Sequence, residues 1–250
     1  MTAAPRMAGQ TALVTGAARR LGAQIARALH AEGANLMIHC HRSREQAQRL
    51  ADELEAARPG STALQCADLC DPRQPERLIA HTCERFGGLN LLVNNASSFY
   101  PTPLGSITLE QWQDLIGTNL QAPLFLAQAA AAHLRHSRGC LLNIVDIHGL
   151  RPLRDHAVYS TAKAGLIMLT RALARELAPE VRVNAIAPGA VLWPERGMDA
   201  QRREHIIGQT PLGRAGTPQD IARTVLFFAT EAPFVTGQIL AVDGGRSVGW

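Results

Sequence analysis

The sequence predicts an α/β fold: a single Rossmann-type, doubly wound parallel sheet of about seven strands with helices on both faces. Short apolar runs alternate with amphipathic helical patterns along nearly the whole chain, and a glycine-containing turn follows the first run. The chain is 46% hydrophobic but only 4% aromatic, which suits aliphatic strands buried on both faces. No linker or repeat divides the 250 residues, so residues 1–250 are expected to form one domain.

The strands are expected where four to seven mostly apolar residues are bounded by turn formers. In chain order they are Thr11–Thr15, Asn35–Cys40, Thr62–Cys66, Leu89–Val93, Cys140–Val145, Arg182–Ala187 and Gln238–Val242. Apolar residues at helical spacing predict helices between them. These helices are Leu21–Glu32, Arg44–Ala57, Pro75–Phe86, Leu109–His136 with a bend near Pro123, Ala157–Leu177 and Pro218–Thr230.

The segment after the sixth strand, Gly189–Gly216, is rich in Pro, Gly and Arg and is expected to be irregular. It begins at the carboxyl edge of the sheet, where ligands bind in open α/β folds. Residues 190–216 are therefore expected to form a substrate loop. Leu192 and Trp193 are candidates for the wall of the site and Arg196 for its rim, although Trp193 fits loop packing or a subunit contact equally well.

Composition narrows the class of protein. The net charge is +4, but the arginines are scattered, so no nucleic-acid partner is expected. The five cysteines form no CxxC pair, which indicates a reducing compartment and no metal site. Neither a signal-like leader nor an apolar run of membrane-spanning length is found, so we expect a cytoplasmic protein that does not bind membranes.

The single lysine of the chain, Lys163, follows Tyr159 by four residues within a predicted helix. Side chains at that spacing share one helix face, about 5–6 Å apart at Cβ. A nearby ammonium stabilises a phenolate and is expected to lower the tyrosine pKa towards neutrality, which would make Tyr159 an acid/base catalyst. The pair is also compatible with an accidental Tyr-x-x-x-Lys, which is common in helices.

The turn after the first strand runs from Gly16 to Gly22 and opens the first helix. A tight turn and a helix N-terminus are what a pyrophosphate requires, and Gly16, Arg20 and Leu21 are assigned to the cofactor. A solvated basic turn is the alternative.

The end of the second strand reads His39-Cys40-His41-Arg42-Ser43 and lacks the carboxylate that usually holds the ribose of NAD. His41, Arg42 and Ser43, joined by Arg20, are expected to bind a 2′-phosphate, which predicts NADPH as the cofactor. His39 is interpreted as a buried structural residue. Asp68, after the third strand, is interpreted either as a partner of the adenine amino group or as a cap.

These motifs together resemble the short-chain dehydrogenase/reductase family over about Thr11 to Gly245. The elements that carry the resemblance are the glycine turn, Asn94-Asn95-Ala96, Asn119, Tyr159-x-x-x-Lys163 and Pro188-Gly189. The resemblance implies that Asn95, Ala96, Ser97, Asn119, Tyr159, Lys163, Pro188 and Gly189 also contact the cofactor. It also implies a homotetramer built partly through the long helices.

Two departures from the family pattern resemble its pteridine reductase subfamily. Asp146 stands where most members carry a catalytic Ser, and Ser97 follows Asn-Asn-Ala where most have Gly. In that subfamily the corresponding Asp, Tyr and Lys are catalytic, and the residue matching Phe99 stacks the pterin on the nicotinamide. The resemblance thus implies that Phe99, Asp146 and Tyr159 bind the substrate. Ser97 and, from the substrate loop, Leu192 and Trp193 complete the expected substrate site, and no metal is expected.

The expected activity is NADPH-dependent reduction of a dihydropterin or dihydrofolate, and the reduction of oxidised pterins stays open. Asp146 is then expected to help protonate a ring nitrogen, and Asn119 to hold a water beside Lys163. An Asp that only caps the loop after the fifth strand is the alternative for Asp146. Two other activities stay open: a ketone or acyl-carrier reductase of the same fold, and a non-catalytic NADPH-binding sensor.

Overall fold

The computed structural model describes residues 4–193 and 199–248. Its strands form one parallel sheet of seven strands in the order β3-β2-β1-β4-β5-β6-β7. The strands are β1 (Thr11–Val14), β2 (Asn35–Cys40), β3 (Thr62–Cys66), β4 (Leu91–Asn94), β5 (Cys140–Ile144), β6 (Arg182–Pro188) and β7 (Ile239–Val242). The predicted doubly wound sheet is therefore confirmed, and each predicted strand lies within two residues of its observed bounds.

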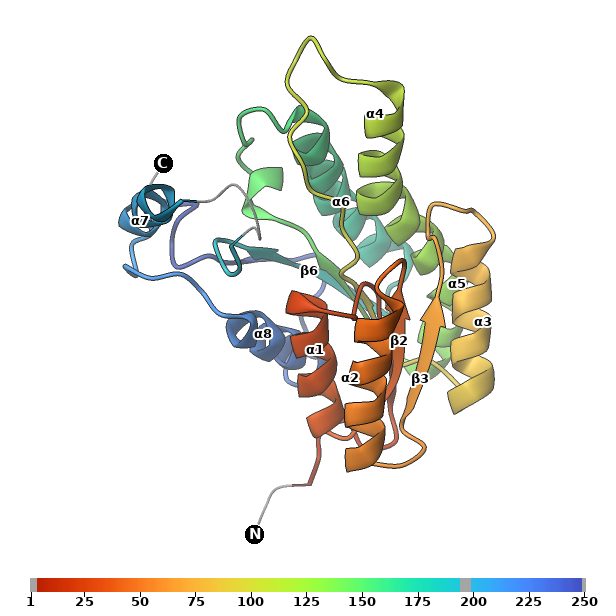
Figure 1. The fold of residues 1–250 in the computed structure, drawn as a ribbon. Coiled ribbons are helices and arrows are strands. Elements are labelled where there is room, and N and C mark those ends of the chain that lie inside the picture. The colour runs from red at the N-terminus through yellow and green to blue at the C-terminus, as the bar shows by residue number, and fades with distance from the viewer. Residues whose placement is uncertain (1–3, 194–198, 249–250) are drawn as a thin grey trace.

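Helices cover both faces of the sheet (Figure 1). One face packs against α1 (Arg20–Ala31), α2 (Arg44–Ala57) and α8 (Pro218–Thr230). The other packs against α3 (Gln74–Phe86), α5 (Ala122–Ser137) and α6 (Ala157–Glu176). On β1, Ala12 and Val14 face the first layer and Leu13 faces the second. Both faces of this strand are apolar because side chains alternate along it and helices exclude water from each side.

The predicted helix over 109–136 is interrupted earlier than expected. The structure has α4 (Leu109–Ile116), a π-helical turn at Gly117–Gln121, and then α5. The bend predicted near Pro123 is thus wrong in position. Pro123 lies in the first turn of α5, directly after the π-helical turn. The wider π-turn instead carries Asn119.

The segment after β6 is not irregular throughout, which corrects the prediction for 189–216. It contains α7 (Ala200–Gly208), which begins where the Asp199 side chain accepts a hydrogen bond from the Arg202 amide at 2.7 Å. The helix has no buried residue, so it lacks the apolar stripe by which a helix is recognised in a sequence.

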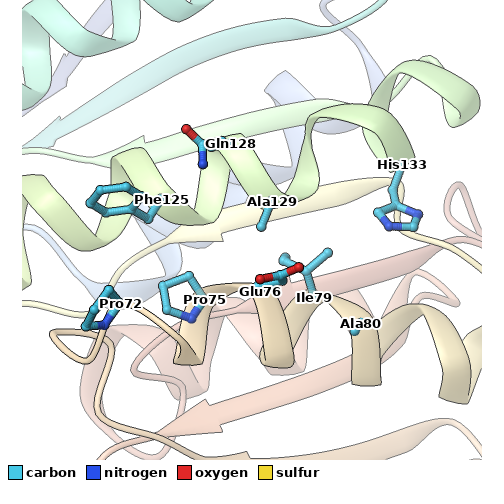
Figure 2. Close-up of a pocket in the computed structure, with 9 residues that line it drawn as sticks. All are labelled: Pro72, Pro75, Glu76, Ile79, Ala80, Phe125, Gln128, Ala129 and His133. Atoms are coloured by element: carbon cyan, nitrogen blue, oxygen red, sulfur yellow. The ribbon is translucent and has the colours of Figure 1, made fainter.

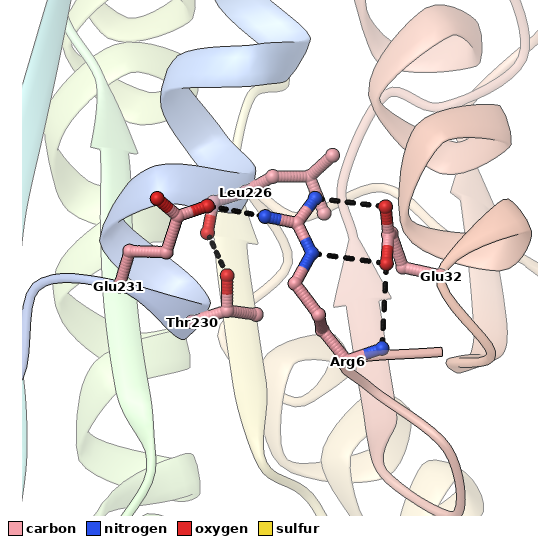
Figure 3. Close-up of polar contacts among 5 residues, drawn as sticks. All are labelled: Arg6, Glu32, Leu226, Thr230 and Glu231. Atoms are coloured by element: carbon pink, nitrogen blue, oxygen red, sulfur yellow. Dashed lines mark hydrogen bonds and ion pairs between the residues drawn. The ribbon is translucent and has the colours of Figure 1, made fainter. Parts of the chain in front are cut away.

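The N-terminal segment is attached to two helix ends, at the edge of the sheet that lies away from the candidate active site. Figure 3 shows Arg6 between Glu32, after α1, and Glu231, after α8. Arg6 donates to both Glu32 oxygens, at 3.0 and 2.8 Å, and pairs with Glu231. Thr230 bonds the Leu226 carbonyl at 2.9 Å. Because the ion pairs are solvent-exposed, they position the chain end and add little to stability.

Candidate active site

Asp146 lies just beyond β5, at the carboxyl edge of the sheet, and uses both of its carboxylate oxygens. One, Oδ1, accepts a hydrogen bond from the His148 amide at 2.8 Å and so caps the short 3-10 turn Ile147–Gly149. The other, Oδ2, accepts a hydrogen bond from the Tyr159 hydroxyl at 2.7 Å. Asp146 therefore caps the loop after β5, and the cap fixes its other oxygen towards the phenol. Its part in protonating a ring nitrogen stays a prediction.

Lys163 lies one helical turn below Tyr159 and is fully enclosed by protein. Its Nζ donates to the Ile144 carbonyl at 3.0 Å and stands 5.7 Å from the centroid of the Tyr159 ring. Burial lowers the pKa of Lys163 to about 8, and the charge of Asp146 opposes that shift. The predicted proximity of phenol and ammonium is present, with the carboxylate of Asp146 as the third member. We call these three residues the Asp-Tyr-Lys trio.

The predicted direction of the Tyr159 pKa shift is wrong. Burial raises the pKa of Tyr159 well above 10, and the charge of Asp146 and its hydrogen bond raise it further. The prediction considered only Lys163, whereas the carboxylate is closer to the hydroxyl. Tyr159 is therefore a protonated phenol at neutral pH, which is the form that can donate a proton to a substrate being reduced.

Phe99 stands over Tyr159. Its ring contacts the Tyr159 ring edge-to-face, with centroids 4.8 Å apart, and it stacks on His156 at the same distance. Phe99 remains 47% exposed, which leaves aromatic surface for a flat ligand beside the hydroxyl. His156 was not singled out from the sequence, because a histidine just before a helix has many ordinary roles.

The loop after β4 is fastened to the π-turn. Ser97 donates to Asn119 Oδ1 at 2.7 Å, and the Asn119 amide donates to the carbonyls of Ser98 and Leu115, each at 2.9 Å. The loop is also fixed by Thr15, whose hydroxyl accepts the amides of Asn95 and Ala96. The side chain of Asn119 thus holds this loop, and its contact with a water beside Lys163 stays a prediction.

The glycine turn fits an anionic cofactor. Gly16 has φ +62°, and a Cβ there would lie 2.9 Å from the Ala96 Cα, so the turn packs directly on the loop after β4. The N-cap residue of α1 makes no side-chain cap hydrogen bond and the first turn carries no acid, which suits a negatively charged phosphate. Leu21 packs on the core from the first turn and orients the helix.

From the sequence, Gly22 is only the last residue of the glycine turn. In the structure it packs closely against the residues of the site. A Cβ there would lie 2.3 Å from the Gly16 carbonyl oxygen and 2.6 Å from Asn95 Nδ2. We expect Gly22→Ala to displace the turn, lower stability by roughly 1–3 kcal/mol and weaken cofactor binding. Thermal unfolding and cofactor titration test this. Gly88→Ala is the matched control, because a Cβ at Gly88 meets nothing within 4 Å.

His39 is buried, as predicted, and ties three segments together. Its Nδ1 accepts from the Gly16 amide at 3.2 Å and its Nε2 bonds the Ala67 carbonyl at 3.0 Å. Burial lowers the pKa of His39 to about 4, so the ring stays neutral. The His39 side chain therefore holds the glycine turn in place through these hydrogen bonds.

The ends of β2 and β3 gather the residues expected to bind a 2′-phosphate. His41 lies 3.8 Å from Asp68 across the two strand ends. Arg42 is exposed and Ser43 half-buried at the start of α2. Asp68 also accepts the Cys70 amide at 3.0 Å and so closes a turn in the loop after β3, but it does not cap α3, which begins at Gln74. The adenine contact stays a prediction.

Arg20 reaches towards the substrate loop. It has φ +54°, a left-handed conformation that is unfavourable for a residue with a side chain, and its Nη2 donates to the Trp193 carbonyl at 3.1 Å. The Trp193 ring lies under the Arg203 guanidinium at 5.7 Å, and Leu192 is exposed. Arg196 lies outside the described residues. The contact of Arg20 with a 2′-phosphate stays a prediction.

Pro188 and Gly189 end β6 beside the last strand. Gly189 donates to the Val242 carbonyl at 3.1 Å, and a Cβ there would lie 2.7 Å from the Asp243 Cα. Glycine is thus required for the approach of two chain segments, and the predicted cofactor contact of both residues stays untested.

A surface groove of about 430 Å³ lies between α3 and α5 (Figure 2). Its wall includes Pro75, Ile79 and Phe125, and it contains no member of the Asp-Tyr-Lys trio. Among the described residues, no cluster of His, Cys, Asp and Glu is arranged to hold a metal ion. No helix in the described ranges is both long and apolar enough to cross a bilayer.

Comparison with known proteins agrees with this fold. Residues 16–247 match the family model described as enoyl-(acyl carrier protein) reductase. The chain is 36% identical to a 3-oxoacyl-[acyl-carrier-protein] reductase of Staphylococcus aureus, over 94% of this chain and 97% of the relative. It is also 36% identical to pteridine reductase 1 of Leishmania tarentolae, over 99% of both chains. A 3beta-hydroxysteroid dehydrogenase of Eggerthella lenta is 34% identical over 96% of this chain and 94% of the relative.

The chain belongs to the short-chain dehydrogenase/reductase family and is an oxidoreductase of that family. The acyl-carrier and pteridine reductases are equally similar in identity, so overall similarity does not select the substrate.

Proposed function

We propose that the protein is a cytoplasmic, NADPH-dependent reductase of pterins, acting on a dihydropterin or dihydrofolate. The observation that carries the proposal is the hydrogen bond from Tyr159 to Asp146, with Phe99 edge-on above the phenol. A carboxylate at this position adds a negative charge and an acceptor beside the proton donor. A pterin presents ring nitrogens and an amino group to such an acceptor, whereas a simple ketone presents only an oxygen.

The residues of the site have distinct parts in this proposal. Phe99 provides the stacking surface for the flat ring, and Tyr159 donates the proton. Lys163 holds the nicotinamide ribose and supplies positive charge near the phenolate that proton transfer leaves behind. The bound dihydronicotinamide supplies the hydride. Ser97, Leu192 and Trp193 complete the substrate site.

The alternative is a ketone or acyl-carrier reductase, which the identity to the Staphylococcus aureus reductase favours. Oxidation of NADPH by the purified protein should be followed with dihydrobiopterin, dihydrofolate, an acetoacetyl thioester and a panel of ketones. The pterin proposal expects turnover of the first two compounds only. Turnover confined to the thioester or ketones overturns it, and no turnover with any substrate favours a binding protein.

The cofactor preference is tested at Arg42, which is exposed beside the end of β2. Arg42→Ala is expected to raise the Michaelis constant for NADPH roughly tenfold, as one charge-assisted contact is lost, with little change for NADH. Arg49→Ala, an exposed arginine further along α2, is the control and should change neither constant. A wild-type preference for NADH contradicts the proposal.

A homotetramer is part of the proposal. Large apolar side chains are exposed on α4 and α6, among them Leu109, Trp112 and Met168. Exposed apolar side chains on adjacent helices support an interface between subunits.

A further inference from the structure

Two of the five cysteines lie directly opposite each other at the ends of neighbouring strands. Cys40, the last residue of β2, is in register with Cys66, the last residue of β3. Their sulfur atoms are 2.7 Å apart. Adjacent strands are about 4.7–4.9 Å apart, within the roughly 4.4–6.8 Å between Cα atoms that a disulfide spans. The backbone is therefore already positioned for a bond between these sulfurs.

The two thiols are not equivalent. Cys40 is 1% exposed and belongs to the core beneath α1 and α2, whereas Cys66 is half-buried at the edge of that core. Burial raises the pKa of Cys40 to about 12, and its hydrogen bond to Cys66 raises it further. Cys40 therefore keeps its proton. Because an oxidant must reach the sulfur, the half-buried Cys66 is the thiol that meets an oxidant first.

The pair lies next to the residues assigned to the NADPH 2′-phosphate. His41, Arg42 and Ser43 follow Cys40 directly, and Ala67 and Asp68 follow Cys66. The Ala67 amide donates to the Cys40 carbonyl at 2.9 Å, and His41 and Asp68 approach within 3.8 Å just beyond it. A covalent bond between the strand ends would alter the spacing of the loops that carry these side chains.

We propose that Cys40 and Cys66 are a peroxide-sensitive thiol pair whose disulfide weakens NADPH binding. Hydrogen peroxide oxidises the Cys66 thiol to a sulfenic acid and is reduced to water. The Cys40 thiol attacks that sulfur, the disulfide forms, and a second water leaves with the remaining oxygen. In total two thiols and one peroxide give one disulfide and two waters. The chemistry is independent of the cofactor, whereas the effect on binding rests on the proposed NADPH function.

Mass spectrometry of the intact, fully reduced chain tests the covalent step. Limited hydrogen peroxide is expected to remove two hydrogens and two titratable thiols, to give a disulfide-linked peptide pair containing Cys40 and Cys66, and to be reversed by dithiothreitol. Cys66→Ser should abolish the disulfide. Cys83→Ser, which removes a half-buried thiol from α3, should leave it intact. Sulfinic acid at Cys66 or a disulfide elsewhere overturns the proposal.

Titration with NADPH before and after oxidation tests the consequence. The dissociation constant is expected to rise roughly tenfold on oxidation, the size of one lost charge-assisted contact, and to be unchanged by peroxide in Cys66→Ser. A disulfide without change in affinity overturns the regulatory part. Reduced protein that binds no NADPH overturns the proposed cofactor and with it this regulatory part, while the mass measurement still decides the thiol chemistry.

Discussion

Replacing Tyr159 by Phe is expected to lower substrate turnover by roughly 10²–10⁴-fold, the range that a positioned proton donor contributes, while NADPH binding is retained. The hydroxyl is the group that the trio holds in place, through its 2.7 Å hydrogen bond to Asp146. The ring is buried with Leu115 and Val158, so phenylalanine preserves the packing. The effect is therefore confined to kcat.

The chain offers a matched control, because it has one other tyrosine. Tyr100 donates its hydroxyl to Asp114 at 2.9 Å, also a phenol–carboxylate contact, in the loop near α4. Tyr100→Phe should leave kcat within about twofold of wild type, far below the effect of a lost general acid. If Tyr159→Phe turned over substrate as fast as Tyr100→Phe, the proton would come from another group.

Much of the fold and the positions of the trio could be predicted from the sequence because each rests on a local pattern. Apolar runs locate the strands, and the spacing of four residues puts Tyr159 and Lys163 on one helix face. Parallel strands that all end at the same edge then bring the residue after β5 to that face. The contact between Asp146 and Tyr159 follows from this common edge.

The parts that could not be predicted depend on contacts between distant segments. The pKa of Tyr159 is raised first by burial and then by Asp146, which lies closer to the hydroxyl than Lys163 does. The spacing of residues along the sequence does not show which of the two charged groups lies closer. The direction in which Arg20 extends is set by the Trp193 carbonyl, 173 residues away. His156 becomes part of the site only because Phe99 folds onto it. Helix α7 carries no buried face that a pattern could reveal.

Asp146→Ser is expected to separate pterin reduction from ketone reduction, because serine removes the charge while keeping a hydroxyl that can steady a carbonyl oxygen. Pterin turnover should fall roughly 10²-fold, at the lower end of acid–base contributions, and any ketone turnover should be kept or increased. Asp146→Asn is the companion variant, since it keeps the shape and hydrogen-bonding oxygen of the side chain without the charge.

The same substitution has a pH signature whose sign follows from the site. In the wild type the pKa of Lys163 is about 8, so the positive charge that stabilises the phenolate is lost as the pH rises through that value. Turnover should therefore decline on the alkaline side. The charge of Asp146 raises the pKa of both Lys163 and Tyr159, so its removal lowers both.

In Asp146→Ser and Asp146→Asn the alkaline decline of kcat should thus begin at lower pH than in the wild type. If Asp146 only caps the Ile147–Gly149 turn, its replacement should instead lower the stability of the protein and leave the pH at which kcat declines unchanged. Measuring kcat against pH alongside thermal unfolding separates these roles. Asparagine can still accept the His148 amide, so Asp146→Asn is expected to keep the stability of the wild type. If the alkaline decline of kcat then begins at lower pH in both variants, the effect belongs to the charge of Asp146. If the alkaline decline of kcat begins at the same pH as in the wild type and pterin turnover is unchanged, Asp146 has no part in the reaction.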